Sequence, residues 1–246
     1  MDSRAHANSF GAAAELYDRI RPRYPADALR WAIGEAPCRI VDLGAGTGIL
    51  TRQLVALGHD VIAVEPDDQM RGQIGSETLS GTAEHIPLGD SSADAVVAGQ
   101  SYHWFDRDPA HVEIARVLRP DGIFAPIWNV RDESEPWVAA LSRLLDDAAG
   151  VERHATLDER TLPADAFGDR FGPVRGATFR WAQPHTPHSL VQLVKSRSYY
   201  LLASAGRRAE IEASVRELAA THAGLAGREE FALPYVTYAY RAHRHP

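Results

Sequence analysis

Between residues 39 and 128, short hydrophobic runs alternate with segments in which apolar residues recur at helical spacing. Such runs are typical of strands buried in a parallel sheet, with helices covering its faces. Strands are expected to open at Ile40, Val61 and Asp94, and another is expected over 123–128. The alternation therefore predicts an α/β fold made of consecutive βαβ units.

Two helices are expected between these strands. The first covers 48–57, where three leucines share one face and Gly58 would end the helix. The second begins at an N-cap, Asp108, and runs to about Leu118. Pro126 counts against the strand over 123–128, because proline has no N–H to give to the ladder.

Beyond residue 130 the alternation stops. The pattern there predicts helices from Pro136, from Ser189 and around an apolar face at Ile211, Val215, Leu218 and Ala219, with strands near 174–182 and 235–240. The last strand alternates as an edge or late antiparallel strand should. We therefore expect one domain over 1–246, in which 36–128 binds a cofactor and 129–246 supplies substrate-side helices and the last strands.

The formal charge of −7 gives no general attraction to nucleic acid or to an anionic membrane. Arg19, Arg21 and Arg23 are accordingly interpreted as a solvated or substrate-facing strip. No apolar run reaches the roughly 18 residues that span a bilayer, and Cys38 alone cannot form an intrachain disulfide. We expect a cytoplasmic enzyme, monomeric or homodimeric, that acts on a small molecule without a nucleic-acid or membrane partner.

The sequence VDLGAGTGIL, 41–50, places an acid before a glycine turn that leads into a helix. A dinucleotide fingerprint would need a third glycine at position 49, which is Ile49. Asp42 would also repel a diphosphate at the end of its strand, whereas it would favour an ammonium or a sulfonium. This turn therefore predicts a cofactor other than a dinucleotide.

Glu65 ends the next predicted strand 21 residues after Gly44. An acid at this position holds the ribose hydroxyls in α/β nucleoside sites. A ligand with a ribose, a cationic amino-acid end and no diphosphate is S-adenosylmethionine, which is the cofactor that we expect.

These segments resemble the class I S-adenosylmethionine-dependent methyltransferases, in particular the small-molecule branch with the type 11 methyltransferase domain, which includes trans-aconitate methyltransferase-like proteins. The resemblance covers residues 9–128, through VDLGAGTG, AVEPDDQM and GTAEHIPLGDSSADAVVAGQSYHWF. It implies a Rossmann-like, doubly wound, mostly parallel sheet of seven strands with an antiparallel last strand. The resemblance does not extend to the substrate region, where we expect helices inserted in the C-terminal half to form a substrate cap.

The resemblance also implies roles for individual residues. Met70 would pack against adenine, Ala83 and Glu84 would flank its edge, and the backbone of Gln100 would lie near the methionine end. The leader over 1–25 would close over the cofactor as a lid, with Tyr17 as a contact. The expected cofactor-binding residues are Tyr17, Asp42, Gly44, Ala45, Gly46, Thr47, Gly48, Glu65, Pro66, Met70, Ala83, Glu84 and Gln100.

The chemical step needs few essential groups, because a bound methyl donor leaves the protein mainly to align reactants and exclude water. If the acceptor is a hydroxyl or phenol, His103 is the candidate base, since it follows a strand at the ligand edge of the sheet. Trp104 and Trp128 are the candidates for a substrate pocket. No metal site is expected. An NAD(P)-linked oxidoreductase and a non-catalytic cofactor-binding protein remain as alternatives.

Overall fold

The computed structural model describes residues 20–149, 161–197, 200 and 203–246. Tyr17 and most of the expected lid therefore lie outside the described residues. The chain divides into two compact units, which are treated separately below. Unit 1 comprises Met1–Pro22, Val130–Ala155 and Arg180–Val236, and unit 2 comprises Arg23–Asn129, Thr156–Phe179 and Thr237–Pro246. The expected single domain with a substrate-side half stays a prediction.

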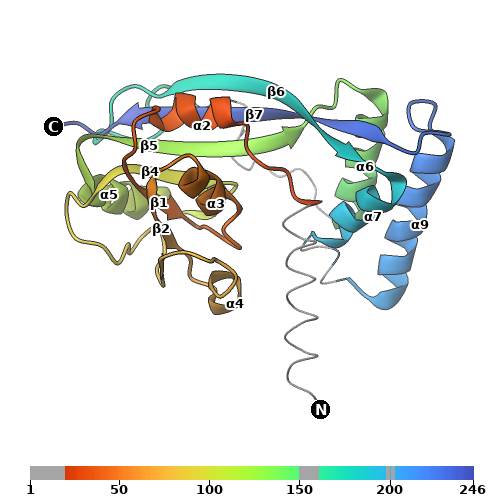
Figure 1. Ribbon diagram of the computed structural model, residues 1–246, viewed down its shortest axis with the longest axis horizontal. Helices are drawn as coiled ribbons and strands as arrows, with labels where there is room; N and C mark the ends of the chain where they lie inside the picture. Colours follow the sequence, from red (N-terminus) through yellow and green to blue (C-terminus); the bar gives the residue numbers. More distant parts are fainter. Residues whose placement is uncertain (1–19, 150–160, 198–199, 201–202) are drawn as a thin grey trace, which may run out of the picture. The chain divides into compact units, whose positions relative to one another are not determined.

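The described strands form a seven-stranded sheet in the order β3-β2-β1-β4-β5-β7-β6 (Figure 1). The strands are β1 Arg39–Leu43, β2 Asp60–Val64, β3 Thr78–Leu79, β4 Ala93–Gly99, β5 Leu118–Arg131, β6 Arg175–His185 and β7 Phe231–His243. The pairs β2–β3, β1–β2, β1–β4 and β4–β5 are parallel. The predicted α/β class and mostly parallel sheet are thus confirmed.

The last strand runs antiparallel to β5, as expected. The N–H of Asp132 donates to the carbonyl of Pro234 (3.0 Å), and that of Arg244 donates to the carbonyl of Gly122 (2.8 Å). The two bonds join opposite ends of the strands, and the arrows of β5 and β7 point in opposite directions in Figure 1. Of the two positions left open for this strand, edge or late antiparallel, the structure shows the second, because β7 lies between β5 and β6.

Strand β5 is longer than the expected 123–128 and continues through Pro126, which lies opposite Ala98 in the ladder. The predicted strand over 123–128 is therefore confirmed, although Pro126 counted against it. Most of the side chains around Pro126 are fully buried, so apolar burial outweighs one missing ladder donor.

The described helices are α2 Ala26–Ile33, α3 Ile49–Ala56, α4 Asp68–Arg71, α5 Arg107–Val117, α6 Pro136–Ala149, α7 Pro187–Lys195 and α9 Ala205–Thr221, with a 3₁₀ turn, η1, over Tyr102–Trp104. Asp106 instead of Asp108 occupies the N-cap position of α5, without a side-chain capping bond, and α7 begins two residues before Ser189. Thr186 caps α7 and Ser189 closes a capping box, which explains the earlier start. No helix among the described residues is long and apolar enough to cross a membrane.

Unit 2 has two packed regions. One is formed by α2, α3 and the strands they cover, and includes Leu29, Leu54 and Val97, with Cys38 partly buried against it. In the other, the ring of Tyr102 packs edge-on against Phe105, Phe124, Trp128 and Phe167. The Tyr102 hydroxyl lies 2.9 Å from Nε2 of buried His111, so a polar pair fixes the centre of this aromatic cluster.

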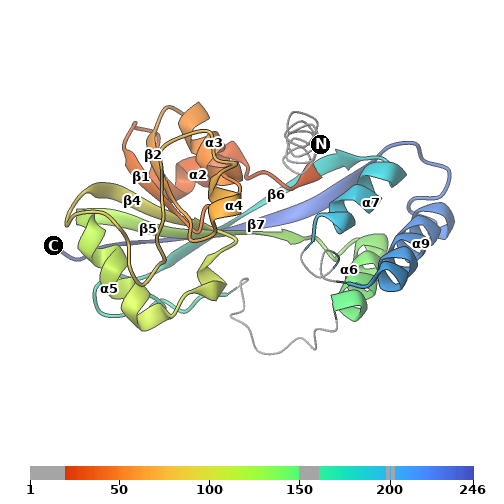
Figure 2. The ribbon, with the colours of Figure 1, turned by 90° about the horizontal axis from the view of Figure 1, so that it is seen from below.

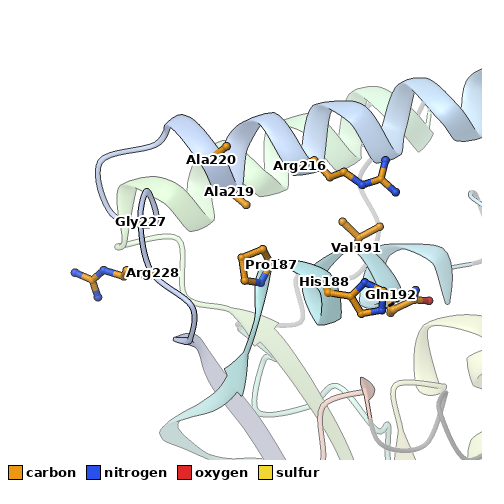
Figure 3. A pocket seen from close by; sticks show the side chains of 9 residues that line it. All are labelled: Pro187, His188, Val191, Gln192, Arg216, Ala219, Ala220, Gly227 and Arg228. Atoms are coloured by element: carbon orange, nitrogen blue, oxygen red, sulfur yellow. Dashed lines mark hydrogen bonds between the residues drawn. The ribbon is translucent and has the colours of Figure 1, made fainter.

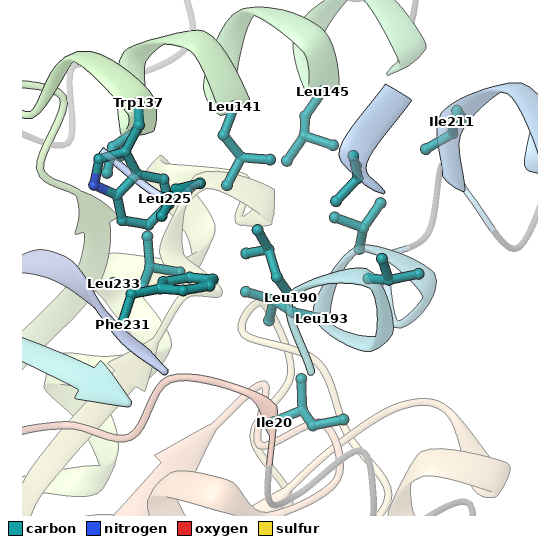
Figure 4. Packing of buried hydrophobic residues seen from close by; sticks show 14 of the residues in the cluster. Ile20, Trp137, Leu141, Leu145, Leu190, Leu193, Ile211, Leu225, Phe231 and Leu233 are labelled. Carbon is teal, nitrogen blue, oxygen red and sulfur yellow. The ribbon is translucent and has the colours of Figure 1, made fainter. Parts of the chain in front are cut away.

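Unit 1 buries the apolar faces of α6, α7 and α9, whose helices lie together in both ribbon views (Figure 2). Trp137 packs edge-on against Phe231, and Leu141, Leu190 and Leu193 extend the cluster (Figure 4). The apolar face predicted for α9 is confirmed, since Ile211, Val215 and Ala219 are buried and Leu218 packs partly buried.

The last residues of the expected lid are fixed to α3. The side chain of Gln53 accepts a hydrogen bond from the Tyr24 N–H (2.9 Å) and donates one to the Tyr24 carbonyl (2.7 Å). Tyr24 is buried, and a Cβ added to Gly99 would lie 2.7 Å from its hydroxyl. The end of the expected lid is therefore held at Tyr24 in this structure, and closure of 1–25 over a cofactor stays a prediction.

Replacing Gln53 with Ala should release this clamp. Removing both bonds to Tyr24 is expected to lower the free energy of unfolding by about 1–2 kcal/mol and to speed hydrogen exchange at the Tyr24 amide. Gln73→Ala is the matched control, because the Gln73 side chain is exposed and, among the described residues, bonds only to the carbonyl of Gln69. Equal effects of the two substitutions would contradict the clamp.

Candidate functional site

The turn between β1 and α3 is open on one side and closed on the other. Gly44, Gly46 and Gly48 have φ values of 71°, 58° and 81°, which favour glycine. A Cβ on Gly44 would lie 2.7 Å from that of Ser101, whereas a Cβ on Gly46 would have nothing within 4 Å. Gly44 thus permits close packing below the turn, and the backbone at Gly46 remains accessible to a ligand.

Asp42, one residue before the end of β1, is 1% exposed. The Thr51 hydroxyl on α3 donates to its Oδ2 at 2.6 Å, while Oδ1 is buried with no hydrogen-bond partner among the described residues. Burial raises the pKa of Asp42 to about 6, although the Thr51 bonds act in the opposite direction. The carboxylate therefore retains an acceptor atom that a cationic group would stabilise.

Glu65, directly after β2, is 6% exposed and lies against the same turn. Its Oε2 accepts from the Gly46 N–H (2.8 Å) and its Oε1 from the Asp67 N–H (3.0 Å). Glu65 therefore holds the glycine turn in addition to the role toward a ribose that the sequence predicts. Two bonds leave acceptor capacity on both oxygens of the carboxylate.

The short helix α4 presents the next expected contacts. Asp67 caps it, accepting from the N–H groups of Gln69 (2.8 Å) and Met70 (3.0 Å). Met70 is 43% exposed, so its thioether side chain can pack against an apolar ligand surface. Pro66 is exposed, and Thr47 in the glycine turn accepts from Arg52 through its carbonyl at 2.7 Å.

Ala83 and Glu84 precede the buried residue Ile86. Ala83 is buried, and Glu84 accepts from the backbone N–H of Asp106 at 2.9 Å. Burial alone would raise the pKa of Glu84, but this bond and other local hydrogen bonds hold it below its usual value. Glu84 therefore has a structural partner at the start of α5 in addition to any ligand contact.

A turn after β4 joins the ends of three strands. Gln100 has a φ of 58°, and its Nε2 donates to the carbonyl of Asn129 at 2.9 Å. Ser101, which the sequence analysis missed, donates from its hydroxyl to the carbonyl of Leu43 at 2.7 Å. The left-handed backbone and these bonds connect β4 to the carboxyl ends of β1 and β5.

Asn129 is a second residue that the sequence analysis missed. It is buried, and its side chain accepts from the Thr237 hydroxyl (2.6 Å) and donates to the carbonyl of Arg23 (3.2 Å). Its own carbonyl accepts from Gln100. An amide at the end of an apolar strand was the available signal, because a buried amide requires partners.

His103 lies on η1, partly buried beside Trp104, whose ring is 80% exposed and 4.9 Å away between centroids. The Nε1–H of Trp128 donates to Nδ1 of His103 at 3.4 Å. Trp128 is completely buried, so it contacts His103 from the protein interior. It presents no surface to a substrate, which contradicts the expectation that it lines a substrate pocket. Trp104 alone of the two tryptophans can meet a ligand.

This contact bears on the protonation of His103. Burial lowers its pKa, which favours the neutral ring. A neutral imidazole that accepts at Nδ1 has its proton on Nε2, so the ring in this geometry is a donor at Nε2. The arrangement therefore favours a hydrogen-bond donor over the general base expected from position.

Unit 1 contains a cavity. It measures about 410 Å³ and is lined by α7, the second half of α9 and residues 227–228, all in unit 1 (Figure 3). It shares no residue with the expected cofactor-binding set. Among the described residues, no cluster of His, Cys, Asp and Glu could hold a metal ion.

Comparison with known proteins identifies the family. Residues 41–125 match the model of the methyltransferase domain. An uncharacterized methyltransferase of Mycobacterium tuberculosis is 42% identical over 239 residues, 95% of each chain. An uncharacterized methyltransferase of Schizosaccharomyces pombe is 31% identical over 241 residues, 94% of each chain.

Solved structures share the fold. A putative methyltransferase from an antibiotic biosynthesis pathway of Anabaena variabilis has a TM-score of 0.66 at 20% identity and covers 91% of this chain and 98% of its own. A putative type II methyltransferase of Anaeromyxobacter dehalogenans has a TM-score of 0.62 at 26% identity and covers 91% and 97%. The trans-aconitate-like branch stays a prediction. The chain belongs to the methyltransferase family, in its class I fold with the type 11 methyltransferase domain.

Proposed function

We propose that this chain transfers a methyl group from S-adenosylmethionine to a small-molecule acceptor. The observation that supports this most strongly is the glycine turn set between two buried acids, Asp42 and Glu65. Two buried carboxylates disfavour a diphosphate and favour a ligand that combines a cation with hydroxyl donors. S-adenosylmethionine has both features.

The residues present fit this cofactor. The unpartnered Oδ1 of Asp42 suits the cationic amino-acid end, and the remaining acceptor capacity of Glu65 suits the ribose hydroxyls. The open side of Gly46 permits close approach of a ligand to the backbone, and exposed Met70 offers an apolar surface for adenine. The bound cofactor supplies an electrophilic methyl group on a sulfonium.

The protein contributes alignment, exclusion of water and local polarity. Ser101 and Gln100 fix the turn after β4, so the start of η1 is held beside the glycine turn. His103 then offers a donor from Nε2 to an acceptor oxygen, and Trp104 offers an aromatic surface. These two side chains are the proposed contacts of the acceptor in unit 2.

The acceptor is an oxygen, carbon or nitrogen nucleophile, and a carboxylate is one class with independent support. A malonyl-[acyl-carrier protein] O-methyltransferase of Methylococcus capsulatus is 36% identical over 133 residues, 48% of each chain. An ionised carboxylate needs no base, which agrees with the donor geometry of His103. We retain the small-molecule acceptor, the cytoplasmic location and the monomeric or homodimeric state as proposals.

Two alternatives are distinguished by binding and turnover. Family membership argues against the NAD(P)-linked oxidoreductase, and a non-catalytic cofactor-binding protein would bind the cofactor without transferring its methyl group. Calorimetric titration with S-adenosylhomocysteine and NADH should show binding of the first ligand alone. Turnover of labelled S-adenosylmethionine on a metabolite panel should then show transfer, and binding without transfer to any acceptor would favour the non-catalytic alternative.

Replacing Glu65 with Ala should weaken S-adenosylhomocysteine binding by about 2–4 kcal/mol, because bonds to the ribose and support of the glycine turn are lost together. Calorimetric titration measures the change. Glu77→Ala is the control, since Glu77 is an exposed acid of the same unit. An unchanged dissociation constant for Glu65→Ala would remove the main support for this site.

Replacing Asp42 with Asn should strengthen the fold and weaken the cofactor site. The folded-state pKa of Asp42 is raised from 3.8 to about 6, so its ionisation lowers stability as pH rises from about 4 to 6 and the cost persists above 6. Asp42→Asn is expected to raise the free energy of unfolding by about 1–3 kcal/mol at pH 7.5, with the gain vanishing near pH 4.

Thermal unfolding across pH measures this gain, and titration with S-adenosylhomocysteine should show binding at least about tenfold weaker, for loss of a charge-assisted bond. Asp60→Asn is the control, because the Asp60 side chain is 66% exposed. A gain that grows as pH falls would contradict the assigned ionisation, and unchanged binding would separate Asp42 from the cofactor.

Replacing His103 tests whether its Nε2 donates a hydrogen bond to the acceptor or removes a proton from it. If Nε2 donates to the acceptor, His103→Ala should lower kcat by about 10-fold or more, while His103→Asn should retain more activity than Ala because its amide can donate. Cofactor affinity should stay within about threefold for both. A wild-type rate that falls with decreasing pH below 6.5, with both variants reduced about 10²–10⁴-fold, would instead restore the general base. His85→Ala, at an exposed position of the same unit, is the control.

A further inference from the structure

A small cavity lies in unit 2, where β6 begins and β7 ends. It measures about 170 Å³ and is lined by Gly172, Pro173, Arg175, Arg241 and His243. This volume is far above the roughly 10–15 Å³ that one water molecule needs, and below the roughly 300–1,000 Å³ of pockets that enclose a drug-sized ligand. The cavity therefore has room for a small ion or a single functional group.

Arg175 and Arg241 reach this cavity from neighbouring strands. A Cβ added to Gly176 would lie 2.9 Å from the ring of Tyr240, so these two residues meet across the β6–β7 pair. The arrows of β6 and β7 point in opposite directions in Figure 1, and successive side chains alternate between the faces of a sheet. Arg175 and Arg241 therefore lie side by side on the other face, where two like charges are unfavourable.

Trp31 of α2 holds Arg241 in place. The guanidinium carbon of Arg241 lies 4.7 Å from the centroid of the indole ring, and its Nη1 donates to the Trp31 carbonyl at 2.5 Å. Phe179, four residues after Arg175 and so on the same strand face, packs edge-on against the same ring. Because Arg241 is already ordered, its remaining N–H groups can bind a ligand with little further loss of entropy.

His243 contributes an acceptor. Its Nδ1 lies 2.9 Å from the carbonyl of Asp121. A carbonyl oxygen only accepts, so Nδ1 carries the proton, and in the neutral ring Nε2 is then an acceptor. Nε2 has no hydrogen-bond partner among the described residues. The cavity thus combines two guanidinium donors with one imidazole acceptor.

The described residues supply no counter-charge to this group. Arg175, Arg241 and His243 form no ion pair with any of them, and Asp121 contacts His243 through its backbone carbonyl. An anion in the cavity would place a negative charge between the two arginines and so replace their repulsion with attraction. Guanidinium groups bind the oxygens of phosphate and carboxylate particularly well.

We propose that unit 2 binds hydrogen phosphate in this cavity, with Arg175 and Arg241 donating to its anionic oxygens and Nε2 of His243 accepting from its P–OH group. Hydrogen phosphate carries acceptors and one donor on a single small ion. Sulfate has the same shape and charge without that proton, and the dianion of a phosphate ester lacks it too. The cavity shares no residue with the expected cofactor-binding set, so the site does not rest on the proposed function.

Thermal unfolding of the full chain at pH 8 and constant ionic strength, titrated separately with inorganic phosphate, sulfate and glycerol phosphate, tests this site. At this pH inorganic phosphate is mainly the dianion that retains one proton. Saturable stabilisation by phosphate is expected, with a dissociation constant about tenfold or more below those of the other two ions, because each of them leaves Nε2 without a donor.

Two substitutions at arginines separate the site from general charge effects. Arg175→Gln should weaken phosphate binding about tenfold or more, because a charge-assisted bond is lost. Arg39→Gln, at an arginine of the same unit outside the cavity whose side chain is 42% exposed, should leave it unchanged.

His243→Asn is the decisive variant, because its amide can keep the bond to the Asp121 carbonyl while the Nε2 acceptor is lost. It should abolish the preference for phosphate over sulfate. A retained preference in His243→Asn would overturn the proposal, as would absence of saturable phosphate binding, equal or tighter binding of sulfate or glycerol phosphate to the wild type, or an equal loss in Arg39→Gln. S-adenosylhomocysteine affinity, measured in parallel, should be the same in all variants, and its absence from the wild type would count against the proposed function alone.

Discussion

The buried carboxylate of Asp42 is the constraint around which the first half of the chain is organised. A carboxylate removed from water is unfavourable unless hydrogen bonds or a counter-charge compensate it. Thr51 supplies one bond from α3, which fixes the helix against the end of β1. The chain then leaves β1 through glycines, whose left-handed backbone reaches α3 within a few residues. Asp42, the glycine turn and α3 therefore form one arrangement, in which the turn brings Thr51 within hydrogen-bonding distance of the buried carboxylate.

Around this acid, the ends of neighbouring strands are connected by polar side chains. Glu65 binds the turn from the end of β2, Ser101 binds the end of β1, and Gln100 binds the end of β5. Each bond joins groups that lie far apart in sequence and meet only because parallel strands share a carboxyl edge. The edge is thus preorganised before any ligand arrives, and preorganisation reduces the entropy lost on binding.

Local patterns sufficed for six of the seven strands, the helix after the glycine turn and the apolar face of α9, because hydrophobic periodicity reports burial directly, but they missed the two-residue strand β3. They failed where contacts between distant segments determine the start of a helix or the burial of a side chain. The start of α5 depends on Glu84, which binds the Asp106 N–H from a distant loop. The burial of Trp128 depends on Tyr102 and Tyr240, which pack on it from other elements.

The candidate site shows the same division. Asp42 and the glycines were readable, since their spacing is set within one strand and one turn. The second role of Glu65 and the buried amide of Asn129 were not, because each depends on partners more than 18 residues away. Sequence reasoning predicted which edge of the sheet carries these groups and left the hydrogen bonds among them undetermined.

The contact between Trp128 and His103 connects the packing of a buried residue to the protonation of the candidate catalytic histidine. An indole N–H can only donate, so a buried tryptophan beside Nδ1 favours the imidazole tautomer protonated at Nε2. That tautomer stabilises negative charge on an acceptor oxygen and does not remove a proton from it. An acceptor ionised at neutral pH, such as a carboxylate, needs no base and is only oriented by that donor, whereas an alcohol would need a base elsewhere. Under the proposed function, a residue with no exposed surface would therefore influence which acceptors can react.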